Sequence, residues 1–240
     1  MRLTEFRVLT FDCYGTLIDW ESGIHTALQP LLEKAGASLS RDAALEAFAR
    51  HESDQEAQTP GMKYSNLLAE VHRRLASEWD VTVPDAAHTA FGASVPDWPA
   101  FADSASSLQY LKKFYKLVIL SNVDRTSFAG SNKRLGVEFD AIYTAEDIGS
   151  YKPDLANFRH MLDHLAAQGI GPDTILHTAQ SLFHDHKPAK SVGLASAWID
   201  RRHEEGGWGA TTPQDDATYD FRFTSMAELA RAHQEDLRAS

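Results

Sequence analysis

The chain has 240 residues, 43% of them hydrophobic and 24% charged, which fits one large globular domain or two smaller ones. The formal net charge of −11 argues against binding to nucleic acid through the phosphate backbone, and no apolar run approaches the ~20 residues of a membrane span. A single cysteine excludes an internal disulfide, and the first residues do not resemble a signal peptide, so we expect a cytoplasmic protein.

In chain order, short apolar runs alternate with helical patterns. Strands are expected at residues 6–11, 117–120, 141–145, 174–179 and 195–199. A loop rich in Gly, Pro and Asp, residues 206–220, precedes a last short strand and helix. Strands that alternate with helices of ~10–15 residues indicate βαβ units. The predicted fold class is therefore α/β, with a Rossmann-like parallel sheet as its core.

Residues 20–97 contain helical runs and no convincing strand. Several prolines between residues 84 and 99 mark the return of the chain to the α/β part. An all-helical insertion after the first strand is expected to cover the strand ends as a cap. We therefore predict a core domain made of residues 1–19 and 98–240, and a helical cap domain made of residues 20–97.

Polar side chains follow the expected strands. Asp12 follows the first strand, Ser121 and Asn122 follow the second, and Lys152 and Asp185 come after later ones. In parallel sheets, ligands bind outside the carboxyl ends of the strands, so these side chains are expected to meet. Each has an ordinary structural explanation on its own, as a turn, a helix cap or a loop. Their occurrence in this order favours a functional site.

A carboxylate that acts as a nucleophile must stay charged, and it must be held by a cation and by hydrogen-bond donors. Lys152 is the candidate cation for Asp12. Thr16, Ser121 and the backbone amides of the turn after Asp12 are candidate donors. Gly15 lets this turn bend sharply beside a ligand. Together these residues are suited to hold a nucleophilic carboxylate.

These polar residues lie in four segments: FDCYGTL (11–17), LSN (120–122), YKPD (151–154) and QSLFHD (180–185). In this order, the segments resemble the motifs of the haloacid dehalogenase superfamily. The resemblance covers nearly the whole chain and includes the helical insertion as the small type of cap. It implies a Rossmann-like hydrolase whose catalytic aspartate is Asp12.

Tyr14 indicates the subfamily. Phosphatases of the superfamily carry a second aspartate at this position, which protonates the leaving alkoxide, whereas a tyrosine with a pKa near ~10 is a poor proton shuttle. Gln180 replaces an acidic residue of the fourth motif, and magnesium prefers a concentration of hard, charged oxygen ligands. A halide leaving group needs no proton. The pattern thus resembles the L-2-haloacid dehalogenase branch, which works without a metal or another cofactor.

The resemblance implies a mechanism of two steps. Asp12 would displace halide from C2 of a 2-haloacid to form an ester. Water would then attack the carboxyl carbon of Asp12 and release a 2-hydroxy acid of inverted configuration. Lys152 and Thr16 would orient Asp12, and Asp185 would position or activate the water.

The same resemblance implies the residues that bind the substrate. Ser121 and the backbone amides of the turn at Tyr14 would hold the substrate carboxylate, while Asn122 would face the departing halide. Arg50 is the best match for the arginine that the family's cap brings to the halide. A solvated charge on a helix face is the alternative for Arg50.

Three residues mark where the chain departs from, or retains, the family's usual pattern. Ser181 is retained from the fourth motif. His184 either supplies a polar contact in the site or belongs to a solvated helix start. Phe158 stands where the family usually has a tyrosine, so one hydroxyl near the nucleophile is missing.

The expected function is hydrolytic dehalogenation of short 2-haloalkanoic acids, such as haloacetates, in the manner of an (S)-2-haloacid dehalogenase. One alternative is another small substrate within the superfamily, including weak phosphatase activity. A less favoured alternative is a non-catalytic binding protein. The expected partner is a small-molecule 2-haloacid rather than nucleic acid or a membrane, and a homodimer is left open.

Overall fold

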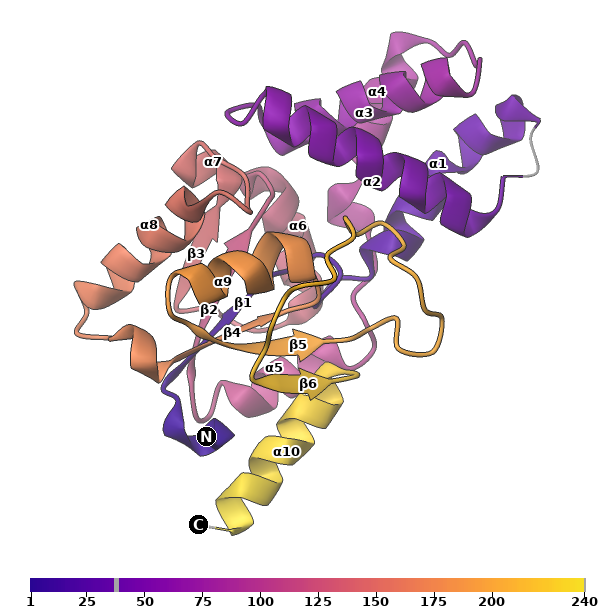
Figure 1. Cartoon of the computed structure of the whole chain (residues 1–240). Coiled ribbons are helices and arrows are strands. Elements are labelled where there is room, and N and C mark those ends of the chain that lie inside the picture. The colour runs from indigo at the N-terminus through magenta and orange to yellow at the C-terminus, as the bar shows by residue number, and fades with distance from the viewer. Residues whose placement is uncertain (37–38, 240) are drawn as a thin grey trace.

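The computed structural model describes residues 1–36 and 39–239 and contains one sheet of six parallel strands (Figure 1). The strand order is β3-β2-β1-β4-β5-β6. The strands are β1 (Val8–Phe11), β2 (Lys116–Ser121), β3 (Ala141–Thr144), β4 (Ile175–Ala179), β5 (Ala195–Ile199) and β6 (Phe221–Phe223). This is the doubly wound order, so the predicted α/β, Rossmann-like fold is confirmed.

Helices cover both faces of the sheet, which is why its central strands are apolar on both sides. Alternate residues of β1 point to opposite faces. Leu9 and Phe11 belong to the hydrophobic cluster that includes α5 (Ser104–Leu111), α6 (Arg125–Leu135) and α10 (Met226–Arg238). Val8 belongs to a second cluster with α8 (Leu155–Ala166) and α9 (Lys187–Ser191), and the short α7 (Ala145–Ile148) follows β3.

The first four α-helices after β1 lie together as a separate layer beyond one end of the strands, as Figure 1 shows. We call them the helical insertion: α1 (Trp20–Ala35), α2 (Arg41–Gln58), α3 (Tyr64–Glu78) and α4 (Asp85–Gly92). Of the predicted cap range, residues 37 and 38 lie outside the described residues. The side chains of Asp19 and Ser40 cap the first turns of α1 and α2.

The helix α4 lies in the region where prolines were expected to mark the return of the chain to the α/β part. Pro84 instead directly precedes the first residue of α4, a position where proline is compatible with the start of a helix. Gly92 then lets α4 approach α3 closely. A Cβ atom at this position would lie 2.1 Å from the backbone oxygen of Ser65.

Hydrogen bonds join the helical insertion to the core of the protein. The hydroxyl of Tyr151 donates to the Met62 carbonyl at 2.5 Å, and the Ser65 amide donates to Asp124 at 2.9 Å. The insertion is therefore docked on the loops that leave the strands. Within residues 1–36 and 39–239, no helix combines the length and the apolar character needed to cross a bilayer.

Candidate active site

Asp12 is the first residue after β1, the strand where the order of the sheet changes direction. Its Oδ2 accepts a hydrogen bond from the Thr16 hydroxyl at 2.8 Å, and Thr16 Oγ1 accepts one from the Gln180 amide at 2.9 Å. Gly15 makes the turn between them with φ of +88°, and a Cβ there would lie 3.0 Å from Trp20 Nε1. Thus only glycine fits this turn without strain.

Lys152 links the two predicted carboxylates. Its side chain is 1% exposed, and Nζ donates to Asp12 Oδ1 at 3.0 Å, to Asp185 Oδ1 at 2.6 Å and to the Leu120 carbonyl at 3.0 Å. These three bonds use every hydrogen of the ammonium. The structure therefore brings Asp12, Thr16, Lys152 and Asp185 together, as expected for a carboxylate held in one orientation.

The two carboxylates differ in their pKa values. Burial raises the pKa of Asp12 above its usual value, although Lys152 and the Thr16 hydrogen bond oppose this shift. Burial also acts on Asp185, but Lys152 and His177 outweigh it and lower the pKa of Asp185. Asp185 is thus the firmly ionised member of the pair. The pKa of Lys152 is raised because its two carboxylate neighbours outweigh burial.

His177 belongs to this cluster, and the sequence analysis missed it. Its Nε2 lies 2.9 Å from Asp185 Oδ1 and its Nδ1 lies 2.8 Å from the Thr10 hydroxyl. A neutral ring with its hydrogen on Nε2 satisfies both contacts, since the threonine can donate to Nδ1. Phe158, which replaces the family's tyrosine, packs its ring edge-on against His177 at 5.1 Å.

The two oxygens of Asp185 differ in their hydrogen bonds. Lys152 and His177 both bond Oδ1, whereas Oδ2 is buried and has no hydrogen-bond partner among the described residues. The Ser121 hydroxyl is also buried and has no hydrogen-bond partner among the residues that the structure describes. Both atoms belong to residues that line one pocket with Asp12. Buried polar atoms that lack partners are suited to bind a ligand or water.

Asn122 lines the same pocket, but its amide is not free to bind halide. Its Nδ2 donates to Glu56 Oε1 at 3.1 Å and to the Lys152 carbonyl at 3.0 Å. Its Oδ1 accepts from the Lys152 amide at 2.7 Å. The predicted halide contact of Asn122 is therefore corrected: this side chain fixes the Lys152 loop and Glu56.

Tyr14 lines the pocket too, with its hydroxyl 2.9 Å from Ser131 Oγ and its ring edge-on to Trp98 at 5.7 Å. Burial raises its pKa well above the ordinary value, so the phenol stays neutral. The hydroxyl is thus engaged with α6. This geometry agrees with the expectation that Tyr14 does not shuttle protons to Asp12.

His184 lies in the short π-helical turn η4 (Leu182–His186), and Ser181 immediately precedes this turn. Ser181 Oγ accepts from the His184 amide at 3.0 Å and lies 3.2 Å from His184 Nδ1. The His184 side chain is 12% exposed, and burial lowers its pKa to about 4. Of the two interpretations of His184, the solvated helix start is wrong, because this histidine is largely buried beside the pocket.

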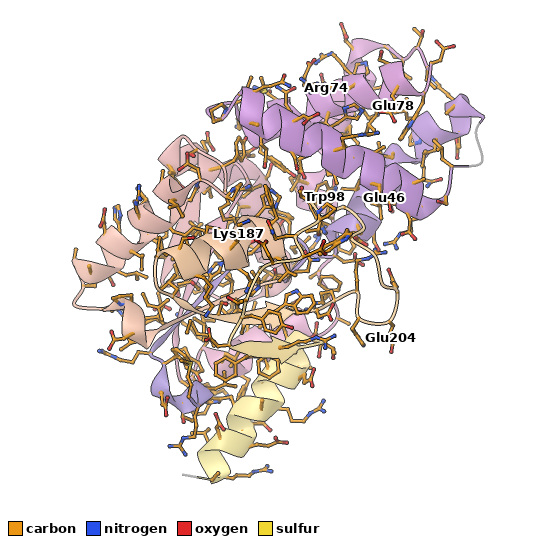
Figure 2. The ribbon with its side chains drawn as sticks, in the orientation of Figure 1. Glu46, Arg74, Glu78, Trp98, Lys187 and Glu204 are labelled. Atoms are coloured by element: carbon orange, nitrogen blue, oxygen red, sulfur yellow. The ribbon has the colours of Figure 1, made fainter. Side chains whose placement is uncertain are left out.

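Arg50 does not reach the pocket. Its side chain is 51% exposed and donates to Glu78 of α3 at 2.9 Å (Figure 2 labels Glu78 in the helical insertion). The prediction that Arg50 meets the halide is corrected, with a reason in the helix geometry. The pocket residue Glu52 stands two positions away, which is about 200° around α2. Arg50 is thus a surface charge.

The residues that α2 does bring to the pocket are Glu52 and Glu56, which the sequence analysis missed. They are 4% and 7% exposed. Burial raises the pKa of Glu52 to about 7 and, together with the neighbouring Glu52, raises that of Glu56 well above its usual value. The spacing of residues along α2 could have indicated the two glutamates, because they continue a buried helical face. The buried residues of this face are Leu45, Phe48, Ala49, Glu52, Gln55 and Glu56.

The complete pocket has a wall from the core and a wall from the helical insertion. The core wall consists of Asp12, Tyr14, Ser121, Asn122, Lys152, Gln180, Ser181, His184 and Asp185. The insertion wall consists of Trp20, Glu52, Glu56 and Tyr64. Within the described residues, no three His, Cys, Asp or Glu side chains are arranged to hold a metal ion.

The fold and the site together define a class: a doubly wound α/β protein whose pocket lies at the switch point of the sheet, around an aspartate, a lysine and a second aspartate. The model of the haloacid dehalogenase-like hydrolase family matches residues 6–178, well over half of the chain. The chain belongs to this family of hydrolases. Curated proteins give no match.

Solved structures resemble the chain over nearly its whole length. The L-2-haloacid dehalogenase from Xanthobacter autotrophicus is 17% identical, with a TM-score of 0.78 over 95% of this chain and 98% of that one. The defluorinating L-2-haloacid dehalogenase Rha0230 is 20% identical, with a TM-score of 0.78 over 98% and 99%. The HAD-hydrolase YfnB from Bacillus subtilis, bound to magnesium, is 17% identical, with a TM-score of 0.76 over 98% and 100%. At these identities the likeness shows the fold.

Proposed function

We propose that the protein hydrolyses short 2-haloalkanoic acids, such as haloacetates, to 2-hydroxy acids through an ester on Asp12. The observation that carries this proposal is the position of Tyr14. Its neutral hydroxyl bonds to Ser131, so the second residue after Asp12 supplies no proton to a basic leaving group. A halide needs none.

In the first step, a carboxylate oxygen of Asp12 attacks C2 of the substrate, the C2–O bond forms, and the C2–halogen electron pair leaves with the halide. Lys152 and Thr16 each bond a different oxygen of Asp12, which holds the carboxylate in one orientation. Fixed orientation of this kind removes much of the entropic barrier to reaction. The unpartnered hydroxyl of Ser121 is the candidate donor to the substrate carboxylate.

In the second step, water attacks the carboxyl carbon of Asp12. Asp185 Oδ2 is an acceptor without a hydrogen-bond partner among the described residues, so it is suited to orient that water and pass its proton to the departing alkoxide. The water oxygen stays in Asp12, and the product carries the oxygen that had attacked C2. Lys152 remains charged throughout and stabilises the carboxylate that is regenerated.

The named structural relatives support this reaction, since two of the three are called L-2-haloacid dehalogenases.

We further propose that the helical insertion, residues 20–97, works as a cap that shields Asp12 from bulk water. Cys13 is buried and free, which fits the reducing cytoplasm that we propose as the location.

A magnesium-dependent phosphatase is the second candidate, favoured by the relative that was solved with magnesium. Three features of the pocket argue against it. Gln180 Oε1 accepts from the Thr211 hydroxyl at 3.0 Å, Asp185 Oδ1 is occupied by Lys152 and His177, and Tyr14 carries no acid. A non-catalytic binding protein is a third candidate. It gives no reason for a buried Asp12–Lys152–Asp185 cluster, which is costly to desolvate.

The test is halide release from chloroacetate, fluoroacetate and 2-chloropropionate, run beside a phosphate-release panel with and without magnesium. The proposal predicts halide release that needs no magnesium and disappears in Asp12→Asn with the fold intact. Phosphate release that requires magnesium, without halide release from any of the three acids, contradicts it.

A further inference from the structure

The pocket presents a charge problem to a haloacid. Asp12, Asp185 and Lys152 leave the core wall with a net charge of −1, and the substrate carboxylate adds another negative charge. Ionised Glu52 and Glu56 would bring the buried site to −4. Charges of one sign repel strongly where water is excluded. At least one of the two glutamates is therefore expected to be protonated when a haloacid is bound.

The hydrogen bonds of Glu56 show which of its oxygens can carry the proton. Oε1 accepts from Asn122 Nδ2 at 3.1 Å, so this oxygen acts as a carbonyl oxygen. Oε2 lies 3.6 Å from His184 Nε2, too far for a hydrogen bond. A proton on Oε2 would thus lie beside His184. Glu52 is engaged elsewhere, because Tyr64 donates to its Oε1 at 2.5 Å.

His184 supplies a second donor at the same place. Ser181 Oγ accepts from the His184 amide, so its own hydrogen is free to donate to Nδ1 at 3.2 Å. That arrangement leaves the hydrogen of the neutral ring on Nε2. This nitrogen is buried and has no hydrogen-bond partner among the described residues. Two donors therefore converge on one spot of the pocket, where no described residue accepts a hydrogen bond from His184 Nε2.

We propose that Glu56 and His184 form the halide site, with protonated Glu56 as the leaving-group donor that replaces the expected cap arginine. This inference rests on the proposed dehalogenation. As Asp12 forms its bond to C2, the C2–halogen electron pair goes to the halide, which accepts hydrogen bonds from Glu56 Oε2 and His184 Nε2. Glu56 keeps its proton. Donors aimed at developing charge in a water-excluded site act strongly on the rate.

The proposal predicts a dependence on pH in one direction. A glutamate whose pKa is raised keeps its proton to higher pH and loses the donor as pH rises further. Deprotonation also places a negative charge beside the departing halide. The groups that face Glu56 are Glu52 and Tyr64 from the insertion, with Lys152, Tyr151 and His184 from the core. Of these, Glu52 is the other carboxylate that can titrate near neutral pH.

The kinetic test is the rapid-quench burst of halide release from chloroacetate between pH 5.5 and 9.5 in four proteins. The wild type should lose burst rate at alkaline pH. Glu56→Ala should be slower by ~10²-fold or more, the usual cost of losing one such donor. Glu56→Gln, whose amide still donates, should keep most of the rate and lose the alkaline decline. Glu46→Gln is the matched control, because Glu46 is an exposed residue of the same helix (labelled in Figure 2).

A second measurement is independent of turnover. Calorimetric titration with chloride and bromide at pH 6 and pH 9 should show binding to the wild type and to Glu46→Gln that weakens at pH 9. Glu56→Ala and His184→Ala should bind at least ~10-fold more weakly at pH 6. Circular dichroism and melting temperature check that each variant is folded. Glu56→Gln tests the same site if the alanine variants do not fold.

An equal burst rate in the wild type and Glu56→Ala, or halide affinity that is unchanged in both alanine variants, overturns the halide site. A burst that accelerates at high pH overturns it as well. These results differ from failure of the proposed function, which is the absence of halide release from all the haloacids in the wild type. In that case halide binding that depends on Glu56 still supports an anion site at this place.

Discussion

The two walls of the pocket are built on different physical principles. On the core wall, Lys152 satisfies two buried carboxylates, and every bond of its ammonium goes to Asp12, Asp185 or a backbone oxygen. On the insertion wall, Glu52 and Glu56 are buried with no cation in hydrogen-bonding contact in the described structure, and their pKa values are raised. The core wall thus holds its carboxylates beside a cation, while burial without a cation raises the pKa values on the insertion wall and favours protonation there.

This difference assigns separate tasks to the two walls. A charge that is paired permanently suits the aspartate that attacks and the aspartate that orients water. A carboxyl group that holds a proton can donate a hydrogen bond to an anion, which an ionised carboxylate cannot do. Changes to the core wall should therefore be larger in effect than changes to the surface of the insertion.

The largest effect is expected for Lys152→Met. Loss of the ammonium leaves Asp12 and Asp185 buried together without the lysine's positive charge, which should lower the free energy of unfolding by about 3–5 kcal/mol. Halide release should fall by ~10²–10³-fold or more, as when a key electrostatic donor is removed. Chemical denaturation and steady-state kinetics measure the two effects.

Lys187→Met is the control for Lys152→Met, since the exposed Lys187 (Figure 2) pairs with Asp216 at 3.4 Å on the surface. It should change stability by less than ~0.5 kcal/mol. Adding Asp185→Asn to Lys152→Met should recover part of the lost stability. If Lys152→Met alone keeps the stability of the wild type, the two buried carboxylates do not need the charge of Lys152, and the prediction is contradicted.

His177→Leu should have the next largest effect, and it should act on one step alone. The histidine bonds Asp185 Oδ1 and so positions the residue that orients water. Ester hydrolysis should slow by about 10-fold to 10²-fold, part of the ~10²–10⁴-fold that a positioned base contributes. The burst of halide release should stay unchanged, and His177→Gln should rescue part of the loss. A slower burst with normal ester hydrolysis would mean that His177 acts in halide displacement, which would contradict this assignment.

Removal of metal should have no effect on the rate. The Lys152 ammonium already lies between the two carboxylates, and a dication at the same place would meet its repulsion. Dialysis against EDTA should leave the rate of halide release the same within error, and added magnesium should not raise it. Loss of activity in EDTA with recovery in magnesium would mean that the core wall binds a cation as phosphatases do.

Among the substitutions, the smallest effect is expected for Arg50→Ala. The guanidinium pairs with Glu78 at the surface, and an exposed pair of this kind contributes about 0–1 kcal/mol. The burst rate should equal that of the wild type, in contrast to Glu56→Ala on the same helix. A loss of ~10²-fold in Arg50→Ala would show that the arginine turns inward during the reaction, and the assignment of the insertion wall would then need revision.

The strand-end residues could be predicted because sheet topology places them. Parallel strands bring their carboxyl ends to one edge, so Asp12, Ser121 and Lys152 converge whatever their exact contacts. His177 lies inside β4 rather than at the end of the strand, so nothing in the sequence marks it as a residue of the site. Its partner could be found only from the register that sets Thr10 of β1 opposite His177.

The insertion wall could not be predicted in the same way. Which face of α2 meets the core depends on helical phase and on how the insertion docks. The expectation placed Arg50 at the site from its position in the second helix, without testing the phase. Buried positions at Leu45, Phe48 and Ala49 continue to Glu52 and Glu56 along one face. The glutamates were overlooked because buried charge is rarely assumed from sequence.

The most direct test of the account is the fate of solvent oxygen in a single turnover. Excess enzyme is mixed with chloroacetate in ¹⁸O-labelled water, and mass spectrometry of the peptide that contains Asp12 and of the product follows the label. An ester on Asp12 predicts label in Asp12 and none in the 2-hydroxy acid of the first turnover. Label in the first product, with Asp12 unlabelled, would mean that water attacks the substrate directly and would contradict the account.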